Sequence, residues 1–293
     1  MRFRDFFLKQ EPLGEEFEST LYDNLWELYE GGNALKNVSK ITQTEVRDTT
    51  PDLLKKIQKA LGLKSGQVKL IGSGGKKPND DDLSSDLDVA VETTPENVQE
   101  HLSELASGGI SRVMKGINVY SFAHDLGNKL VQVDLIPVNN INFAEWSYQA
   151  NEKDLADGLK GAHRNELFFA IAKYMPQKIT KKDAAGEPLT LHRNFYDLSR
   201  GLMTGVKTRV KENGKVVKNF TTKDKKVVTD DPVKVVKLMF GDHVTPEQAS
   251  TFEGTLEAIR SPEFINRDKV IDIVKQASEG IKNKGLKVPS SLN

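Results

Sequence analysis

The sequence has no cysteine, so it can form neither a disulfide bond nor a thiolate-bound zinc site. It also has no apolar run of the about 18 residues that a membrane-spanning helix needs, and its longest run lies near 167–172. At the N-terminus, charged residues interrupt the apolar ones too early for a secretory signal peptide. These absences predict a protein that has no membrane contact, and we expect it in the cytoplasm.

Net charge is absent as well. Lys+Arg and Asp+Glu both number 42 in a chain of 293 residues, so the overall charge indicates nothing about partners. Any electrostatic function must come from charges that gather locally. With 37% hydrophobic and 29% charged residues the chain is rather polar, and its length favours two domains or one domain with extensions.

The most informative pattern lies between Gln67 and Glu92. Residues 68–71 predict a strand that ends at Gly72 and Ser73. After a polar loop, apolar residues at 87, 89 and 91 alternate with polar ones and predict a second strand. Because alternate side chains of a strand point to the same face, Asp86 and Asp88 lie together, with Cα atoms about 6.6 Å apart.

Two carboxylates on one face predict a bound cation. Like charges about 4 Å apart repel by about 4 kcal/mol even at an effective dielectric constant near 20, so a cation between them would be stabilising. Mg²⁺ prefers oxygen ligands and usually binds one or two carboxylates together with phosphates. A further predicted strand at 131–137 supplies a third acid, Asp134. The acidic run at 80–82 has no strand periodicity, and we expect it to be a solvated loop.

The turn at Gly72 and Ser73 has the features of a phosphate-binding loop. Glycine lets the backbone approach a phosphate closely, and exposed N–H groups and a hydroxyl can donate hydrogen bonds to its oxygens. The sequence therefore predicts a metal cluster and a phosphate-binding turn within one short segment.

Taken together, these residues resemble the DNA polymerase β-like nucleotidyltransferase superfamily over roughly residues 50–140. Its pattern is an apolar residue, Gly and Gly or Ser, about a dozen residues, Asp-x-Asp flanked by apolar residues, and a later acid on a neighbouring strand. The corresponding segments here are Ile71-Gly72-Ser73, Asp86-Leu87-Asp88-Val89 and Asp134.

The resemblance implies a catalytic mechanism. Asp86 and Asp88 would bind two Mg²⁺ ions, or Mn²⁺ in their place, and Asp134 would bind one of them and help to deprotonate the attacking hydroxyl. Gly72, Ser73 and Ser85 would bind the triphosphate of a nucleotide such as ATP, and pyrophosphate would leave. The acceptor stays open, since members of this superfamily modify nucleic-acid ends, protein side chains, small molecules or other nucleotides.

Two other interpretations stay open. The protein could be a non-catalytic nucleic-acid-binding or virion-associated component that retains the fold, although the complete acid triad argues against a lapsed site. The carboxylates could also form a structural calcium site. The opening Met1-Arg2-Phe3, followed by Phe6, Phe7 and Leu8, resembles the start of many tailed-phage proteins, which would place the protein in a host cytoplasm or a virion.

The pattern predicts an α+β fold in three parts. Residues 1–49 form an N-terminal extension, with two short helices between 3 and 30 and then a linker, and a helix begins at Thr50-Pro51. Residues 50–141 form the catalytic domain, a small mixed sheet with another helix over 94–105 and strands at 117–122 and 129–138. Residues 142–293 form a mostly helical domain with three helices at 232–240, 246–259 and 267–281, and a frayed tail from 285.

The C-terminal part also has a cluster of basic residues, from Lys207 to Lys226. Asn213-Gly214 between apolar residues predicts a two-residue hairpin turn, so the cluster forms a basic hairpin near 205–229. Such a hairpin suits the phosphate backbone of a nucleic-acid acceptor, but it could equally be a solvated face. Arg164 and Lys173 could reach phosphates, although solvated or capping functions fit them better.

Overall fold

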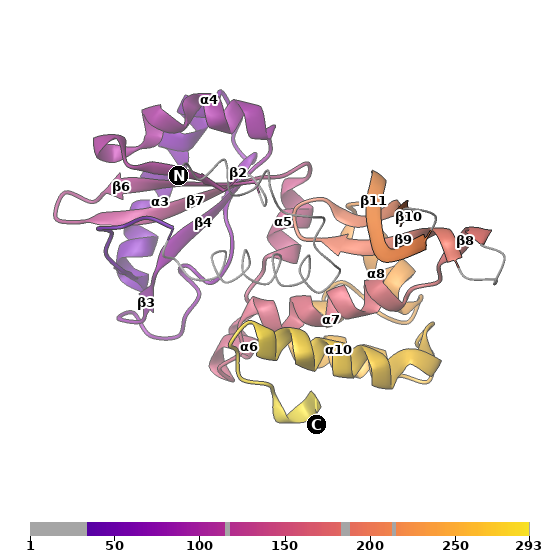
Figure 1. Cartoon of the computed structure of the whole chain (residues 1–293). Coiled ribbons are helices and arrows are strands. Elements are labelled where there is room, and N and C mark those ends of the chain that lie inside the picture. Colours follow the sequence, from indigo (N-terminus) through magenta and orange to yellow (C-terminus); the bar gives the residue numbers. More distant parts are fainter. Residues whose placement is uncertain (1–33, 115–117, 183–187, 213–214, 293) are drawn as a thin grey trace.

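The computed structural model describes residues 34–114, 118–182, 188–212 and 215–292 (Figure 1). One mixed sheet with its helices forms the N-terminal half of this part, and an antiparallel sheet with further helices forms the C-terminal half. The predicted α+β class is confirmed. The helices predicted between residues 3 and 30 lie outside the described residues.

The first sheet has the strand order β2-β4-β7-β6-β5. Strands β4 and β7 are parallel, and the other neighbours are antiparallel, so the sheet is mixed as predicted. Its strands are β2 (Val68–Leu70), β4 (Asp86–Val91), β5 (Ser111–Met114), β6 (Val119–Asp125) and β7 (Leu130–Pro137). The sequence pattern did not predict β5. A short pair, β1 (Ile41–Thr42) and β3 (Leu83–Ser84), lies beside this sheet.

The two faces of this sheet differ in chemistry. Leu87, Val89 and Val133 point to one face and pack with α3 (Gln43–Leu61) and α4 (Pro95–Leu105) in a buried apolar core. The alternate residues of the same strands point to the opposite face, which therefore carries the acids and is partly covered by α5 (Ile141–Ser147). The strand period thus separates the core of the domain from its polar face.

The helix α3 begins at Gln43, earlier than the sequence pattern predicts. Thr42 is its N-cap, and the Thr42 side chain and Glu45 form a capping box, which satisfies two backbone donors at the helix start. Pro51 therefore lies inside the helix rather than at its first position. The prediction of a linker up to residue 49 is wrong for 43–49, because the capping box is a stronger start signal than Thr50-Pro51.

A four-stranded antiparallel sheet corrects the prediction of a mostly helical C-terminal part with one hairpin. Its order is β11-β10-β9-β8, from β8 (Lys178–Lys182), β9 (Pro188–Asp197), β10 (Gly201–Glu212) and β11 (Lys215–Thr229). The predicted hairpin is β10 and β11, and its turn at 213–214 lies outside the described residues. All residues of β8 are exposed, so this edge strand has no apolar alternation by which the sequence could reveal it.

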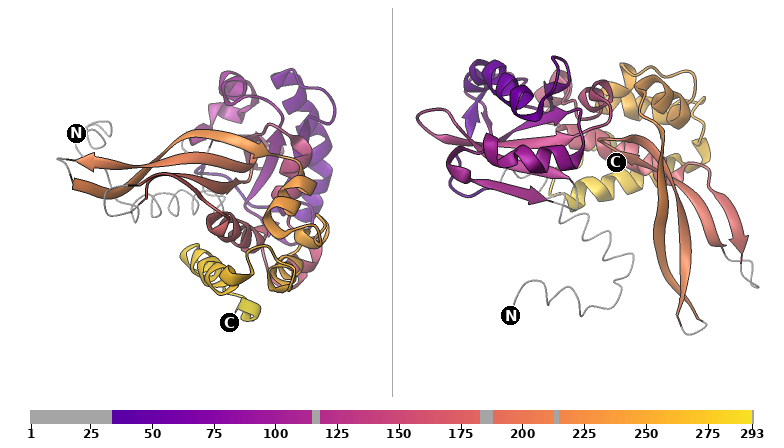
Figure 2. Two further views of the ribbon diagram at one scale, coloured as in Figure 1. Left: turned by 90° about the vertical axis from the view of Figure 1, so that its right-hand side faces the viewer. Right: turned by 90° about the horizontal axis from the view of Figure 1, so that it is seen from above.

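The long strands β10 and β11 extend away from the helices (Figure 2). Their pairing shifts register at three places, between Leu202 and Met203, between Thr204 and Val206, and between Arg209 and Lys211. Each shift inserts extra residues into β11, and such bulges bend a strand and increase its twist.

Four C-terminal helices pack into a second core: α7 (Gly161–Tyr174), α8 (Pro232–Phe240), α9 (Phe252–Arg260) and α10 (Val270–Asn283). The short helix α6 (Glu152–Ala156) precedes them. The three predicted C-terminal helices are thus confirmed, with the second beginning later than predicted. The predicted frayed tail is wrong over 286–292, because Leu292 is buried and the Ser291 hydroxyl donates to Glu253 at 2.7 Å. Within the described ranges, no helix has both the length and the apolar character of a transmembrane span.

Candidate metal centre

The three predicted acids lie together. Asp86 and Asp88 belong to β4, and Asp134 lies directly opposite Asp88 on the parallel neighbour β7. One carboxylate oxygen of each lies within 4.8 Å of the others. The cluster forms because two period-2 strands run in the same direction in a register that pairs their acidic positions.

Burial gives these acids unusual proton affinities. Asp86 is half-buried, and burial together with the charge of Asp134 raises its pKa to about 7, against the opposing effects of Ser85, Lys77 and Lys160. Asp134 is 3% exposed, and burial raises its pKa too. The cluster therefore holds negative charge poorly without a compensating cation.

Gln132 contacts the third acid directly. It lies two residues before Asp134 on β7, so both side chains point to the same face. Its amide nitrogen donates to both carboxylate oxygens of Asp134, at 3.0 and 3.1 Å. Gln132 was not among the predicted site residues, although a polar residue two positions before an acid in an apolar strand indicates a side chain on the same face.

The predicted turn lies against the acids. Gly72 has φ +70°, and a Cβ atom there would lie 2.5 Å from Oδ2 of Asp88. The preceding Ile71 donates its N–H to the carbonyl of Asp88 at 2.9 Å. Glycine is favoured here by its positive φ, and a side chain would in addition displace the carboxylate of Asp88, a contact that the sequence alone did not reveal.

The two predicted serines are placed differently. Ser85 donates its hydroxyl to Oδ1 of Asp86 at 3.2 Å, so it contacts the cluster. Ser73 is half-buried in the turn, where its carbonyl accepts from the N–H of Lys76 at 3.2 Å. Their predicted contacts with a triphosphate stay predictions.

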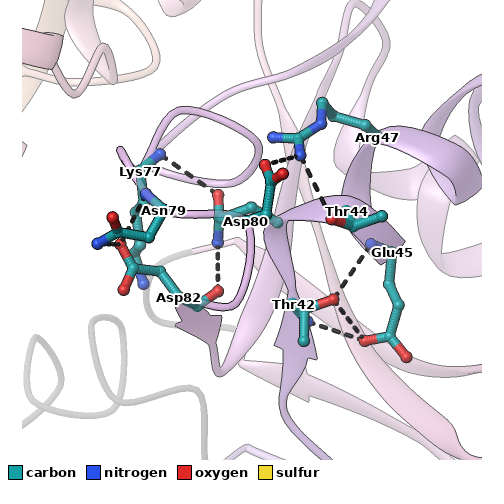
Figure 3. A network of polar contacts seen from close by, with 9 residues as sticks. Thr42, Thr44, Glu45, Arg47, Lys77, Asn79, Asp80 and Asp82 are labelled. Carbon is teal, nitrogen blue, oxygen red and sulfur yellow. Dashed lines mark hydrogen bonds and ion pairs between the residues drawn. The ribbon is translucent and has the colours of Figure 1, made fainter.

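The loop between the turn and β4 is held against the start of α3. Gln43 accepts from the N–H of Lys77 at 3.3 Å and donates to the carbonyl of Asp82 at 3.0 Å. Figure 3 shows this network, in which Arg47 also forms an ion pair with Asp80. Asp80 thus pairs with α3 and Asp82 accepts from the N–H of Asn79 at 3.2 Å, in agreement with the prediction that this acidic run is not the metal site.

Two lysines that were not among the predicted site residues lie near the cluster. Lys77 in this loop and Lys160 just before α7 are close enough to Asp86 for their charges to lower its pKa. Lys77 comes from near the acids in sequence, whereas Lys160 arrives from the other half of the chain. Only the tertiary structure could have identified Lys160.

Other selected residues lie away from the cluster. Arg164 is 1% exposed and donates to the carbonyls of Trp146, Ser147 and Ser250, so the expected capping function agrees with the structure, whereas a solvated or phosphate-contacting side chain does not. It serves instead to satisfy backbone carbonyls at the ends of neighbouring elements. Lys173 contacts Gln276 on α10.

The residues fit a divalent cation with oxygen ligands. The donors are carboxylates without histidine or cysteine, which suits Mg²⁺, Mn²⁺ or Ca²⁺ rather than Zn²⁺. Such an ion would neutralise the crowded charge of Asp86 and Asp134.

Comparison of the chain with protein-family models, curated proteins and solved structures returned no match.

Proposed function

We propose that the protein is a metal-dependent nucleotidyltransferase that moves a nucleoside monophosphate from a nucleoside triphosphate to an acceptor hydroxyl. One observation carries the proposal: three carboxylates from two parallel strands lie within 4.8 Å beside a glycine turn. Two-metal carboxylate sites suit phosphoryl transfer, because the metals stabilise both the attacking and the leaving oxygen.

In this proposal Asp86, Asp88 and Asp134 bind the metal ions. When bound, the ions supply charge stabilisation at the reacting phosphate. The acceptor oxygen forms a bond to the α-phosphorus, the bond to the bridging oxygen of the β-phosphate breaks, and pyrophosphate leaves. Asp134 accepts the proton of the hydroxyl, and burial raises its pKa, which makes it a stronger base than an exposed aspartate.

The surroundings of the cluster supply positive charge for the triphosphate. Lys77 and Lys160 approach Asp86 from two different parts of the chain. We assign them contacts with the β- and γ-phosphates, with the Gly72-Ser73 turn beside them. A lysine binds phosphate as a point charge and needs no strict geometry.

Nucleic acid is the acceptor that the charge distribution favours. The four-stranded sheet combines the hairpin predicted from sequence with the exposed Lys178, Lys181 and Lys182 of β8. Lys225 and Lys226 of β11 are exposed on the other edge strand. Basic side chains on edge strands also prevent sheet aggregation, so binding has to be measured.

The direct test is transfer of label from α-labelled nucleoside triphosphates with Mg²⁺, in the presence of DNA ends, tRNA, bulk protein or no acceptor. We expect label on one acceptor class with the parent protein and none with Asp88→Asn. Absence of transfer to every acceptor would contradict the proposal. If Ca²⁺ then raised the melting temperature more than Mg²⁺, a structural calcium site would explain the cluster.

A further inference from the structure

Gln132 is a fully buried polar residue in a strand that is otherwise apolar around it. Its side chain is 0% exposed, and its neighbours Val131 and Val133 point into the core on the opposite face. Burial of an amide costs free energy unless its donors and acceptor are paired. Gln132 has partners on both sides, since its nitrogen donates to Asp134 and its oxygen accepts from the N–H of Leu35 at 3.0 Å.

The two contacts determine the orientation of the amide. A backbone N–H can only donate, so the group of Gln132 that faces Leu35 must be its oxygen. The NH₂ group must then face Asp134, where it can donate to the carboxylate in its ionised form. Asp134 is thereby held as an acceptor, which is the state that a metal ligand requires.

Leu35 belongs to a segment, residues 34–40, that is attached to the acid-bearing sheet at several points. Arg112 donates to the carbonyl of Ala34 at 3.1 Å, and Ser39 donates its N–H to the carbonyl of Leu130 at 2.7 Å. Ala34 and Leu35 are buried, and Ala34 packs with Ile71 at the start of the glycine turn. The segment is thus a part of the domain next to the acids.

We propose that Gln132 is a positioning residue that orients Asp134 for metal binding, and that the N–H of Leu35 orients Gln132 in turn. The segment 34–40 thereby belongs to the metal centre although it supplies no ligand. This inference rests on the proposed metal site. Its tests measure metal binding without nucleotide, so their outcome does not depend on the proposed transfer reaction.

The first test is Mn²⁺ affinity by calorimetry. Gln132→Met keeps the side-chain volume and removes the hydrogen bonds with Asp134 and with Leu35, and we expect the affinity to fall about 10–100-fold, as for other residues that orient metal ligands. Gln132→Asn, whose side chain is too short for its amide to contact both partners, should lower the Mn²⁺ affinity to a similar extent. This variant replaces the methionine variant in the test if the latter does not fold. Unchanged affinity in both variants would overturn the proposal.

A matched control separates positioning from general loss of stability. Val133→Ala changes the adjacent residue on the same strand, but on the face that packs against the core. It should lower the melting temperature and leave the Mn²⁺ affinity within about twofold of the parent. If Val133→Ala lowered the affinity as much as Gln132→Met, Gln132 would have only a structural function.

The second test concerns the link to Leu35. Leu35→Pro removes the N–H that contacts Gln132, whereas Lys36→Pro introduces the same ring at a neighbouring, exposed position. We expect only Leu35→Pro to weaken Mn²⁺ binding. Combined with Gln132→Met it should weaken binding no further, because the methionine variant already lacks the hydrogen bond from Leu35. Additive effects of the two changes would refute the coupling.

Discussion

Asp88 and Asp134 occupy directly opposed positions on two parallel strands, β4 and β7. In a parallel pair, such residues point to the same face of the sheet and lie about 4.8 Å apart between neighbouring strands. Asp86 is two residues before Asp88 on the same face, beside Gln132. Strand geometry alone therefore gathers the three acids, and every further feature of the centre acts on this arrangement.

The first prediction tests the ligands. Asp88→Asn should lower the transfer rate at least about a thousandfold, because the charge stabilisation supplied by bound metal is worth several kcal/mol. Asp81→Asn, which neutralises an exposed acid of the adjacent loop, should keep the parent rate. Initial rates of label transfer with Mg²⁺ give the comparison, and full activity of Asp88→Asn would eliminate the assigned metal centre.

The second prediction concerns pH and metal removal. An aspartate ordinarily has a pKa of 3.8, whereas the pKa of Asp86 in the folded protein is about 7. Between pH 3.8 and about 7, the folded state therefore retains a proton that the unfolded state has lost. The free energy of unfolding of the metal-free protein should decrease as the pH rises through this interval, by on the order of a few kcal/mol.

Asp86→Asn supplies the comparison for this pH effect. It cannot ionise, so it should lack this part of the pH dependence and should unfold at higher denaturant concentration than the parent at pH 8. Saturating Mg²⁺, at about 100 times its dissociation constant, should restore about 2.7 kcal/mol to the parent. Denaturant unfolding at several pH values, with EDTA or Mg²⁺, measures both effects. Identical pH profiles of parent and variant would show that Asp86 does not have a raised pKa in the folded protein.

The third prediction concerns Gly72. Gly72→Ala should displace the carboxylate of Asp88, since the added Cβ would lie 2.5 Å from its oxygen. Gly66→Ala is the control, because Gly66 also has positive φ but a Cβ added there would meet no atom within 4 Å. Both variants should lose about 1–2 kcal/mol of stability from the left-handed backbone. Only Gly72→Ala should also lose metal affinity, and an equal affinity in the two variants would show that the close approach is unimportant.

The fourth prediction concerns the lysines. Lys77→Gln and Lys160→Gln should each raise the KM for the nucleoside triphosphate by about 10–100-fold, the equivalent of one charge-assisted contact. The exposed Lys153→Gln, near Lys160 in sequence, should leave KM unchanged. Steady-state kinetics with a fixed acceptor distinguishes these outcomes. If all three variants had the KM of the parent, the phosphates would bind elsewhere.

The fifth prediction concerns the basic hairpin. Binding to a short single strand and to a tRNA-like hairpin should weaken log-linearly with salt between about 50 and 300 mM, with a slope near −0.7 to −0.9 per phosphate contact. Lys215→Gln/Lys218→Gln should make the slope shallower by about two contacts for every sequence tested. The measurement is fluorescence anisotropy at several salt concentrations.

A charge-matched control makes this test specific. Lys275→Gln/Lys282→Gln removes two exposed charges from α10 and should leave the slope unchanged. An unchanged slope in the hairpin variant, or no binding at the lowest salt, would show that the hairpin is a solvated face. The acceptor would then be a protein or a small molecule.

Much of the metal centre could be predicted from the sequence. The alternation around Asp86, Asp88 and Asp134 predicted three acids on one face, because a strand has a period of two wherever it occurs. The strand that ends at Gly72, the helix α4, whose N-cap is Thr94, and the hairpin of β10 and β11 could also be predicted, each from its own local pattern. Their signals are local, and residues a few positions apart determine them.

The start of α3 was mispredicted although its signal is also local. Two cap signals, at Thr42 and at Thr50, compete, and only the folded chain shows that the capping box at Thr42 begins the helix and that Pro51 is accommodated within it. The exposed strand β8 could not be predicted from the sequence, because an edge strand without a buried face has no alternation of apolar and polar residues.

The sequence by itself determined which residues could form the metal centre and which class of fold would carry them. Only the tertiary structure decided what surrounds them: that Lys160 joins the acids from the other half of the chain, that Arg164 is buried and that Leu35 contacts Gln132. These relationships join residues up to 97 positions apart. They arise from strand pairing and helix packing, in which the partner is set by the whole fold and not by neighbours in the sequence.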